Sequence, residues 1–449
     1  MIPRTVTTAV LSYLLAGCAT YTPRPLEVSD ETTARALDRL VIEASDLNMP
    51  QLAGATVRIA PDGSMNPTGA AALAVVANPD LRAARAKAGV ARAQLIAAGI
   101  LPNPQLTASA DVPSFGATND TVTAYGVGLS WDITSLLAHD ASISAARSEV
   151  EAVDLQIAWE EWQTAMVAKL DATRVAWIER RLRDAISTEG AARLAASELS
   201  RALDAGWVTE VETSAAAAAV ERAVAARIAL ASARDAELLA LKRAIGLAPG
   251  TPIIVIDDVQ PVGAPPTVTV DELDRRRLDL VALRRGYESQ EERLRGAVLS
   301  QYPKISVGFN AGSDTSDVGT LGLGVSIDVP LFDRGQGRIA AESATREQLH
   351  EEFVARCFSA RAELAQAEQQ LAATLVEARQ SAEVVARLER LAASLAAAVS
   401  SGQAQILASY EVRQQLAEAN QARLALEQSC AEIRVAFETV SGRLIEETR

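Results

Sequence analysis

Aromatic and basic residues are scarce in this chain of 449 residues. Phe, Trp and Tyr make up 4% of its residues. It contains 43 Lys and Arg but 57 Asp and Glu, which gives a formal net charge of −14. Nucleic-acid binding needs a basic surface for phosphate contacts, so no nucleic-acid partner is expected. Large globular cores draw much of their burial energy from aromatic rings. The apolar share of 49% is instead mostly Ala, Leu and Val, which is typical of long helices.

Histidine and cysteine are also rare, with 2 His and 3 Cys. Cys357 and Cys430 fall about 25 Å apart along one predicted helical hairpin, beyond the reach of a disulfide, so we expect both to be buried and unpaired. His139 and His350 occupy unrelated positions, and we expect surface histidines there rather than metal ligands. The sequence therefore predicts no enzyme, no cofactor and no metal site.

The N-terminus has the features of an export signal. Residues 1–17 contain one basic residue and a short apolar run, too short for a permanent membrane span. They lead into Leu15-Ala16-Gly17-Cys18, the pattern of bacterial lipoproteins, in which the Cys18 thiol takes up diacylglycerol. Further acylation, as by palmitate, strengthens such an anchor by about 0.8 kcal/mol per buried methylene. We expect a lipid-anchored protein of the cell outer membrane; the alternative is an ordinary signal peptide with an incidental cysteine.

The rest of the chain repeats itself once. Pro104 and Pro303 lie 199 residues apart, and an offset of 196 then holds for residues 126–132 against 322–328 and for Gly206 against Gly402. So many matches at a nearly constant offset indicate an internal duplication. We therefore predict a signal peptide (1–17), a lipid-anchored N-terminal segment (18–70), a first repeat (71–250), a linker (251–272) and a second repeat (273–446).

Each repeat contains two stretches that alternate between apolar and small or polar residues, the pattern of a β-hairpin with one apolar face. The four stretches are 106–112, 126–131, 305–311 and 321–329. Such strands suit a transmembrane β-barrel, although a soluble hairpin packed on a core is the alternative. Four strands cannot close, because the smallest such barrels have about eight. A barrel must then be shared between copies, as a dimer of eight strands or a trimer of twelve.

Each hairpin leads into a helix of unusual length. The stretches 135–203 and 339–401 contain no proline and almost no glycine, and they would span about 90–100 Å as helices. Turns at Gly206 and Gly402 send the chain back through 208–245 and 404–440. Within the second hairpin, a coiled-coil spacing links Val384, Leu388, Leu391, Leu395 and Ala398. Several such hairpins side by side could form the wall of a tube.

Three segments resemble landmarks of the TolC-type outer-membrane factors, the channels of bacterial efflux and export systems. They are Asn78-Pro79-Asp80-Leu81, the segment 97–104 (AAGILPNP) and the segment 329–335 (VPLFDRG). The Leu-Pro-Asn-Pro form is similar to the branch that serves heavy-metal pumps, and the resemblance covers nearly the whole mature chain. It implies a mainly α fold with a membrane β-barrel, closing as a trimer into a 12-stranded barrel and a long α-helical tunnel.

The resemblance also implies partners. A homotrimer in outer-membrane lipid would extend into the periplasm and dock, through the helical tips at Gly206 and Gly402, to a periplasmic membrane-fusion (adaptor) protein and an inner-membrane RND-type transporter. Members of the family close the periplasmic end with an acid six residues after the tip glycine. That position is Glu212 in the first repeat and Ala408 in the second.

Glu212, with Asp204 and Glu210 nearby, is therefore the gate candidate, and a plain helix N-terminal carboxylate is the alternative. Asp132 and Asp328, at the ends of the return strands, would favour cations at the barrel base if they face inward. The predicted function is a passive efflux conduit. Two alternatives stay open: a coiled-coil envelope lipoprotein without a pore, and the exit duct of a type I protein secretion system.

Overall fold

The computed structural model describes residues 21–23, 25–26, 57–115, 120–257, 268–403 and 405–445. The chain divides into two compact units, Met1–Arg35 and Ala36–Arg449, and the fold described below belongs to the second. The predicted signal peptide and Cys18 lie outside the described residues, so the lipid anchor stays a prediction.

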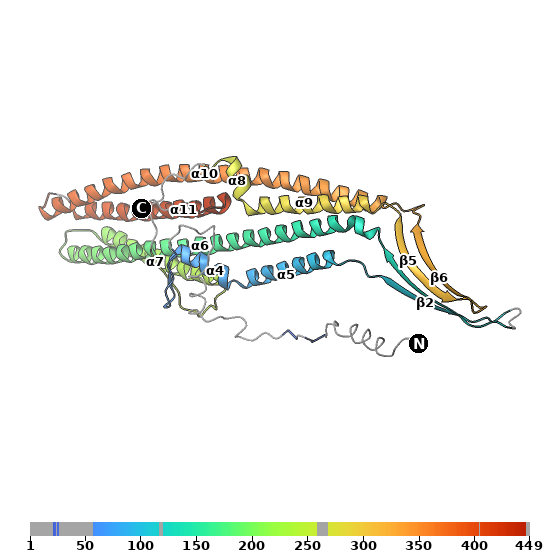
Figure 1. The fold of residues 1–449 in the computed structure, drawn as a ribbon. Helices are drawn as coiled ribbons and strands as arrows, with labels where there is room; N and C mark the ends of the chain where they lie inside the picture. Colours follow the sequence, from blue (N-terminus) through green and yellow to red (C-terminus); the bar gives the residue numbers. More distant parts are fainter. Residues whose placement is uncertain are drawn as a thin grey trace. The chain divides into compact units, whose positions relative to one another are not determined.

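One order of elements occurs twice: a helix, two antiparallel strands, a very long helix and a returning helix (Figure 1). The predicted hairpins and long helices are confirmed. The first series is α5 (Pro79–Gly99), β2 (Gln105–Asp111), β3 (Ala124–Asp132), α6 (Ser135–Asp204) and α7 (Glu210–Ile245). The second is α9 (Leu278–Leu299), β5 (Lys304–Ser313), β6 (Gly319–Asp328), α10 (Gln336–Ser400) and α11 (Ile406–Ser441).

Short elements that the sequence did not predict surround these two series. They are α4 (Pro67–Ala77), α8 (Val270–Arg276) and a parallel pair formed by β1 (Ser64–Met65) and β4 (Ile254–Val255). The expected boundaries at residues 70 and 272 fall inside α4 and α8.

The four long strands form one antiparallel sheet in the order β2-β3-β5-β6. The pairing of β3 with β5 joins the two repeats, with Leu129 opposite Phe309 and Trp131 opposite Val307. Strands β2 and β6 are the two edges. Because the strands are antiparallel and consecutive, β2 and β5 lead away from the helices while β3 and β6 return to them.

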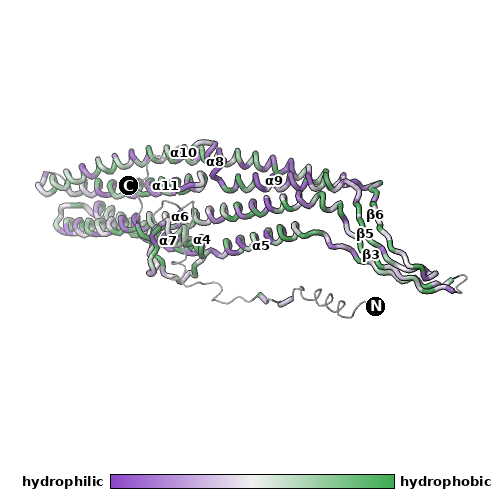
Figure 2. Tube along the Cα trace, viewed as in Figure 1, coloured by the Kyte–Doolittle hydropathy of each residue, from purple (hydrophilic) through white to green (hydrophobic). Residues whose placement is uncertain are grey.

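The long helices owe their length to uninterrupted helix-forming residues. α6 has 70 residues and α10 has 65, which corresponds to about 100 Å each. Apolar and polar residues intermingle along both (Figure 2). Among the helices of the described residues, none combines the length and the apolar character that a membrane span requires.

The returning helix of each repeat ends against the first helix of that repeat. α7 ends at Gly246, whose φ of 90° favours glycine, and a Cβ there would lie 2.7 Å from Pro79 Cδ. Asn78 ties the junction together: its side-chain amide donates to the Ala244 carbonyl at 2.8 Å, and its side-chain oxygen accepts from the Asp80 N–H at 2.8 Å. In the second repeat Gly442, with φ 68°, ends α11 beside Arg276 and Arg277, where α8 leads into α9.

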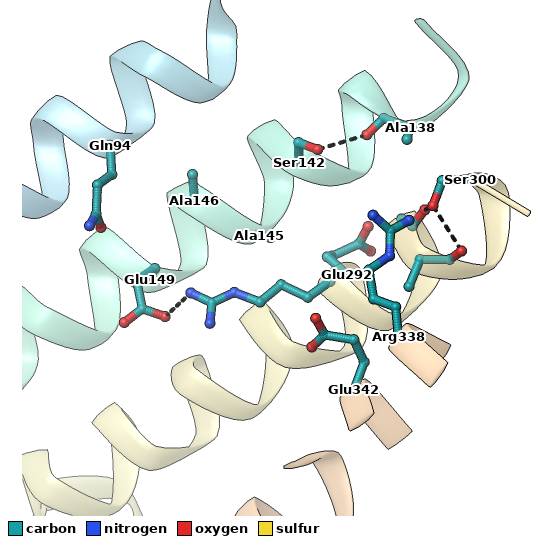
Figure 3. A pocket seen from close by; sticks show the side chains of 13 residues that line it. Gln94, Ala138, Ser142, Ala145, Ala146, Glu149, Glu292, Ser300, Arg338 and Glu342 are labelled. Atoms are coloured by element: carbon teal, nitrogen blue, oxygen red, sulfur yellow. Dashed lines mark hydrogen bonds and ion pairs between the residues drawn. The ribbon is translucent and has the colours of Figure 1, made fainter. Parts of the chain in front are cut away.

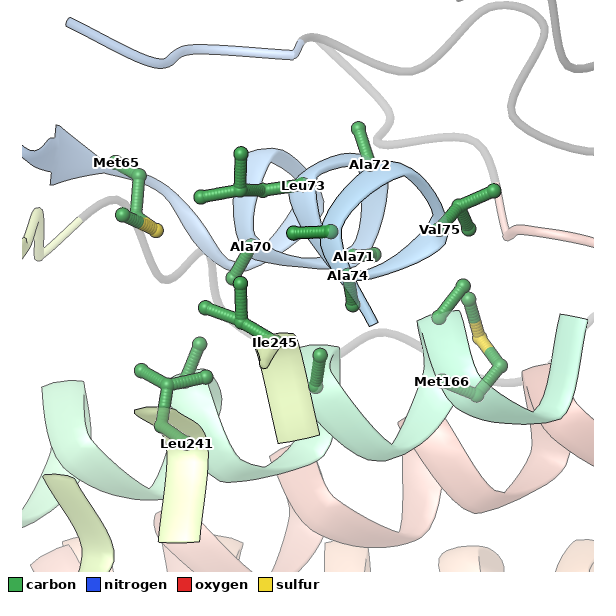
Figure 4. Close-up of a cluster of buried hydrophobic side chains, with 14 of the residues drawn as sticks. Met65, Ala70, Ala71, Ala72, Leu73, Ala74, Val75, Met166, Leu241 and Ile245 are labelled. Atoms are coloured by element: carbon green, nitrogen blue, oxygen red, sulfur yellow. The ribbon is translucent and has the colours of Figure 1, made fainter. Parts of the chain in front are cut away.

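The larger apolar core surrounds α4, which packs against α6 and α7 (Figure 4). Small alanines let this helix approach closely, and Leu73, Leu241 and Ile245 are fully buried there. Trp162 of α6 is 1% exposed and donates its indole N–H to the Thr439 carbonyl of α11 at 3.0 Å. These contacts hold the two helical hairpins together at mid-length.

A second core joins α8, α9, α10 and α11 around Leu273, Leu280 and Phe437. Arg277, at the start of α9, is 1% exposed. Its guanidinium donates to both carboxylate oxygens of Asp279 at 3.1 and 2.9 Å and to Glu363 at 2.9 Å. It also lies over the Trp159 ring of α6, 4.9 Å from the ring centroid. One buried cation thus links α6, α9 and α10.

A second charged cluster lies near the middle of α6. Arg174 contacts Glu237 of α7 at 3.3 Å, Glu432 of α11 at 3.2 Å and Asp171 of its own helix at 3.8 Å. Asp171 is buried, and this long contact with Arg174 is a weak one. Burial and the nearby Glu237 raise the pKa of Asp171 to about 6, although Arg174 opposes the shift.

Asp171→Asn is expected to raise the free energy of unfolding at pH 7.5 by about 1–3 kcal/mol. The folded-state pKa lies above the ordinary value of 3.8, so the wild-type chain gains stability as the pH falls through 6 toward 4. The variant lacks this gain. Urea unfolding of the wild type and the variant at pH 4.5, 6 and 7.5 measures the difference in stability between them. Asp235→Asn, at an exposed position, is the control. A stability difference from wild type that does not change with pH would contradict the prediction.

Candidate channel wall and helical tips

The four-stranded sheet has an apolar face that nothing in the described part of the chain covers. The register aligns Leu106, Leu129, Phe309 and Leu323 across the four strands. All four are exposed, with Leu323 at 79% and Phe309 at 62%. Contiguous exposed apolar surface of this kind marks an interaction with a membrane or another protein. The strands of 7 to 10 residues approach the length that a tilted membrane strand needs.

The opposite face of the sheet carries small and polar residues. Asn310 lies between two glycines of neighbouring strands: a Cβ at Gly128 would be 2.6 Å from its Oδ1, and one at Gly324 would be 3.1 Å from its Nδ2. Larger side chains at these glycines would collide with Asn310. The face therefore stays thin and hydrophilic.

Asp132 and Asp328 both fall on this polar face by register. Asp132 is opposite Ser306, and Asp328 is opposite Lys304. The Asp132 carboxylate accepts hydrogen bonds from the N–H groups of Thr134 and Ser135 at 2.9 and 3.3 Å, which fixes the turn that leads into α6. Asp328 is exposed. Their predicted placement on one face agrees with the register, while their effect on ions stays a prediction.

The tips at the far end of the long helices are tight turns on glycine. Gly206 and Gly402 have φ of 75° and 73°, in the left-handed region. The residue after each glycine donates its N–H back into the helix, Trp207 to Ala202 and Gln403 to Ala398, at 2.8 Å in both cases. Trp207 is 83% exposed, so the first tip presents an indole to its surroundings.

Glu212, the gate candidate, forms a capping box at the start of α7. Its carboxylate accepts from the Thr209 N–H at 2.6 Å and from the Thr209 hydroxyl at 2.9 Å. These hydrogen bonds hold the pKa of Glu212 below its ordinary value, so it stays charged in neutral solution. Glu210 lies in the same first turn, and Asp204 is the last residue of α6. The structure thus gathers the three predicted acids at one tip.

A tyrosine links the two hairpins just above the tips. The Tyr410 hydroxyl of α11 donates to the Glu198 carboxylate of α6. Burial and this carboxylate raise the pKa of Tyr410 to about 12, so the phenol keeps its proton under physiological conditions. No local pattern in the sequence indicates this pair, because its partners are 212 residues apart.

A cavity of about 340 Å³ opens between α5, α6, α9 and α10 (Figure 3). Arg293 lines the cavity and donates to Glu149 at 3.0 Å, and the Gln290 amide donates to the lining residue Glu342 at 2.6 Å. Ala145, Gly296 and other small residues complete the lining. Paired charges and small side chains form a polar recess in the helical wall, without a nucleophile and base arranged for chemistry.

His350 has closer carboxylate neighbours than expected. Within the described residues, Glu347, His350 and Glu351 are the group of potential metal ligands whose donor atoms lie within 4.8 Å of one another. All three are exposed on one helix, and the His350 ring contacts Glu351 at 3.3 Å. The i, i+3, i+4 spacing in the sequence could have revealed this grouping. Cys357 and Cys430 are buried and free, as predicted.

Comparison with known proteins supports the architecture. Searches of protein families and of curated proteins find no match. Among solved structures, CusC, described as forming a transmembrane channel, is 18% identical over 84% of this chain and 92% of its own, with a TM-score of 0.70. The outer-membrane channel OprN is 17% identical over 95% and 98%, with a TM-score of 0.72.

The Neisseria gonorrhoeae outer-membrane channel MtrE, solved in its open state, is 15% identical to this chain. The match covers 96% of this chain and 100% of MtrE, with a TM-score of 0.69. At these identities the likeness concerns the fold. The chain described here therefore has the fold of the bacterial outer-membrane channel proteins.

Proposed function

We propose that the protein is the outer-membrane channel of a tripartite efflux system, a passive conduit from the periplasm to the cell exterior. The observation that carries the proposal is the four-stranded sheet, with an uncovered apolar face and a small polar face, set at the end of helices about 100 Å long. A sheet of this polarity suits a membrane wall around water, and the helices suit a periplasmic duct.

The active form in this proposal is a homotrimer. Strands β2 and β6 are open edges of opposite direction, so β6 of one copy can pair with β2 of the next in the same antiparallel manner. Three copies then close a barrel of twelve strands, and its small inward residues leave a wide bore. Lipid on Cys18 would anchor each copy. The helical tips would meet a periplasmic adaptor protein, which connects the channel to an RND-type pump.

Conductance in planar lipid bilayers tests the proposal. Purified full-length protein is expected to form trimers in detergent and to give discrete, long-lived conductance steps after reconstitution. A coiled-coil lipoprotein that only spaces the envelope would give none, and that result would refute the channel. Deletion of the gene separates efflux from a type I secretion duct. Loss of an efflux channel should raise sensitivity to metals, dyes or antibiotics, whereas loss of a secretion duct should abolish the secretion of proteins.

Replacement of Glu212 tests the gate. Glu212→Gln keeps a side-chain acceptor for the Thr209 N–H and removes the charge, whereas Glu212→Ala removes both. If Glu212 forms a threefold acidic ring, both variants should lose cation preference in bilayer recordings. Asp235→Asn, away from the tip, serves as the control. If Glu212→Gln leaves both the conductance and the cation preference unchanged, Glu212 only caps α7 and does not form a gate.

A further inference from the structure

Two apolar segments flank the open edges of the sheet and have no cover within the described part of the chain. The first is Ile100-Leu101, just before β2, with exposures of 65% and 46%. The second is Leu331-Phe332, just after β6, with exposures of 70% and 92%. Both lie within the segments 97–104 and 329–335.

Both segments are held in place by their own chain. The Pro102 carbonyl, next to Leu101, accepts a hydrogen bond from the Trp131 indole at 2.8 Å. The Phe332 carbonyl accepts from the Gln336 amide at 3.1 Å, and the Asp333 carboxylate accepts from the Gly335 N–H at 2.8 Å. An exposed aromatic ring on an anchored backbone loses little freedom on binding, which is the property of a preformed contact.

The topology places the two segments at the same end of the sheet. β2 begins where the chain leaves the helices and β6 ends where it returns to them. Leu101 lies four residues before Gln105, and Phe332 lies four residues after Asp328. Each therefore extends at most about 13 Å beyond its strand toward the helices. Within one chain, β3 and β5 separate the two edges and keep these segments apart.

We infer that Leu331 and Phe332 of one copy pack on Ile100 and Leu101 of the next copy, and that this apolar contact fixes the pairing of β6 with β2 between subunits. The inference rests on the proposed trimer and goes beyond it, because it assigns a side-chain contact that aligns β6 of one copy with β2 of the next. β6 contains Gly319, Gly322 and Gly324, and backbone hydrogen bonds to a glycine-rich strand specify register weakly. A side-chain contact next to the edge supplies the missing specificity.

Disulfide trapping tests the contact in the full-length protein. The background carries Cys357→Ala and Cys430→Ala and must form the same oligomer as wild type. Leu101→Cys combined with Phe332→Cys is expected to give dimer and trimer bands on oxidation, which collapse on reduction, because a disulfide needs Cα atoms within about 7 Å. If the register between subunits is shifted by one residue, the pair Ile100→Cys and Phe332→Cys should give these bands instead.

Leu101→Cys with Tyr302→Cys is the matched control. Tyr302 is 54% exposed at the same end of the sheet, but it precedes the inner strand β5. This pair is expected to give no bands above the monomer. In addition, Phe332→Asp should lower the trimer fraction at a given protein concentration, whereas Phe332→Leu should preserve it.

Native mass spectrometry separates the possible failures. Trimers without cross-links in both test pairs would overturn the inferred contact and leave the proposed channel standing. Monomers alone in the wild-type protein would overturn both. A bimane label on the thiol of the single variant Phe332→Cys that is quenched by spin-labelled phospholipid would show that this position contacts lipid, and this result would also overturn the contact between subunits.

Discussion

Arg277→Ala is expected to lower the free energy of unfolding by about 3–5 kcal/mol, because it removes one member of a buried ion-pair network. Asp279 would stay buried and lose both hydrogen bonds from Arg277, keeping its bond from Arg356 at 2.7 Å. The Trp159 ring would lose the cation above it. The junction of α6, α9 and α10 would then contain an incompletely paired carboxylate and a void.

Urea unfolding of the protein in detergent measures this loss. Arg276→Ala is the matched control, since the neighbouring Arg276 pairs with Glu272 at 3.7 Å and both side chains are exposed, at 45% and 40%. Exposed pairs contribute about 0–1 kcal/mol, so this variant should stay near wild type. Equal losses in the two variants would contradict the special role of the buried cation.

The same network makes the free energy of unfolding depend on pH. Burial alone would raise the pKa of Asp279, but the hydrogen bonds from Arg277 and Arg356 outweigh it and hold that pKa below the ordinary value of 3.8. A lowered carboxyl pKa contributes stability that is fully present at neutral pH and is lost as the pH falls below that value. Asp279 and Asp171 thus respond to acid in opposite directions.

The sequence was most informative where structure is local. It placed α6 at 135–203 against an observed end at Asp204, because nothing interrupts the helix before the tip glycine. It also indicated the alternating strands, whose faces follow from a period of two. The capping box at Thr209 and Glu212 was not predicted, although a threonine followed three residues later by glutamate is a local signature.

Features that depend on distant residues could not be predicted. α4 shows no amphipathic pattern because it is buried on nearly all sides, so periodicity did not reveal it. The coiled-coil spacing placed Val384 and Leu391 in the seam, yet both are exposed in the single chain and Val385 is buried instead. Arg277 and Glu363 are 86 residues apart, so no local sequence pattern predicts their contact.

The two faces of β5 provide the sharpest test of the proposed membrane wall. Phe309 and Asn310 are neighbours near the middle of β5, and successive side chains of a strand point to opposite faces. Phe309 shares the apolar face with Leu129 and Leu323, and Asn310 lies between the glycines of the polar face. The same substitution at each position should therefore have opposite consequences.

Phe309→Arg is expected to abolish insertion, since an arginine toward lipid at the bilayer midplane costs about 2–4 kcal/mol in each subunit. Asn310→Arg should insert normally and reduce cation conductance, because it adds a positive charge from every copy to the bore. Membrane fractionation and single-channel recording measure the two effects. If Asn310→Arg failed to insert while Phe309→Arg conducted, the apolar face would line the bore, and the assignment of the faces would be reversed.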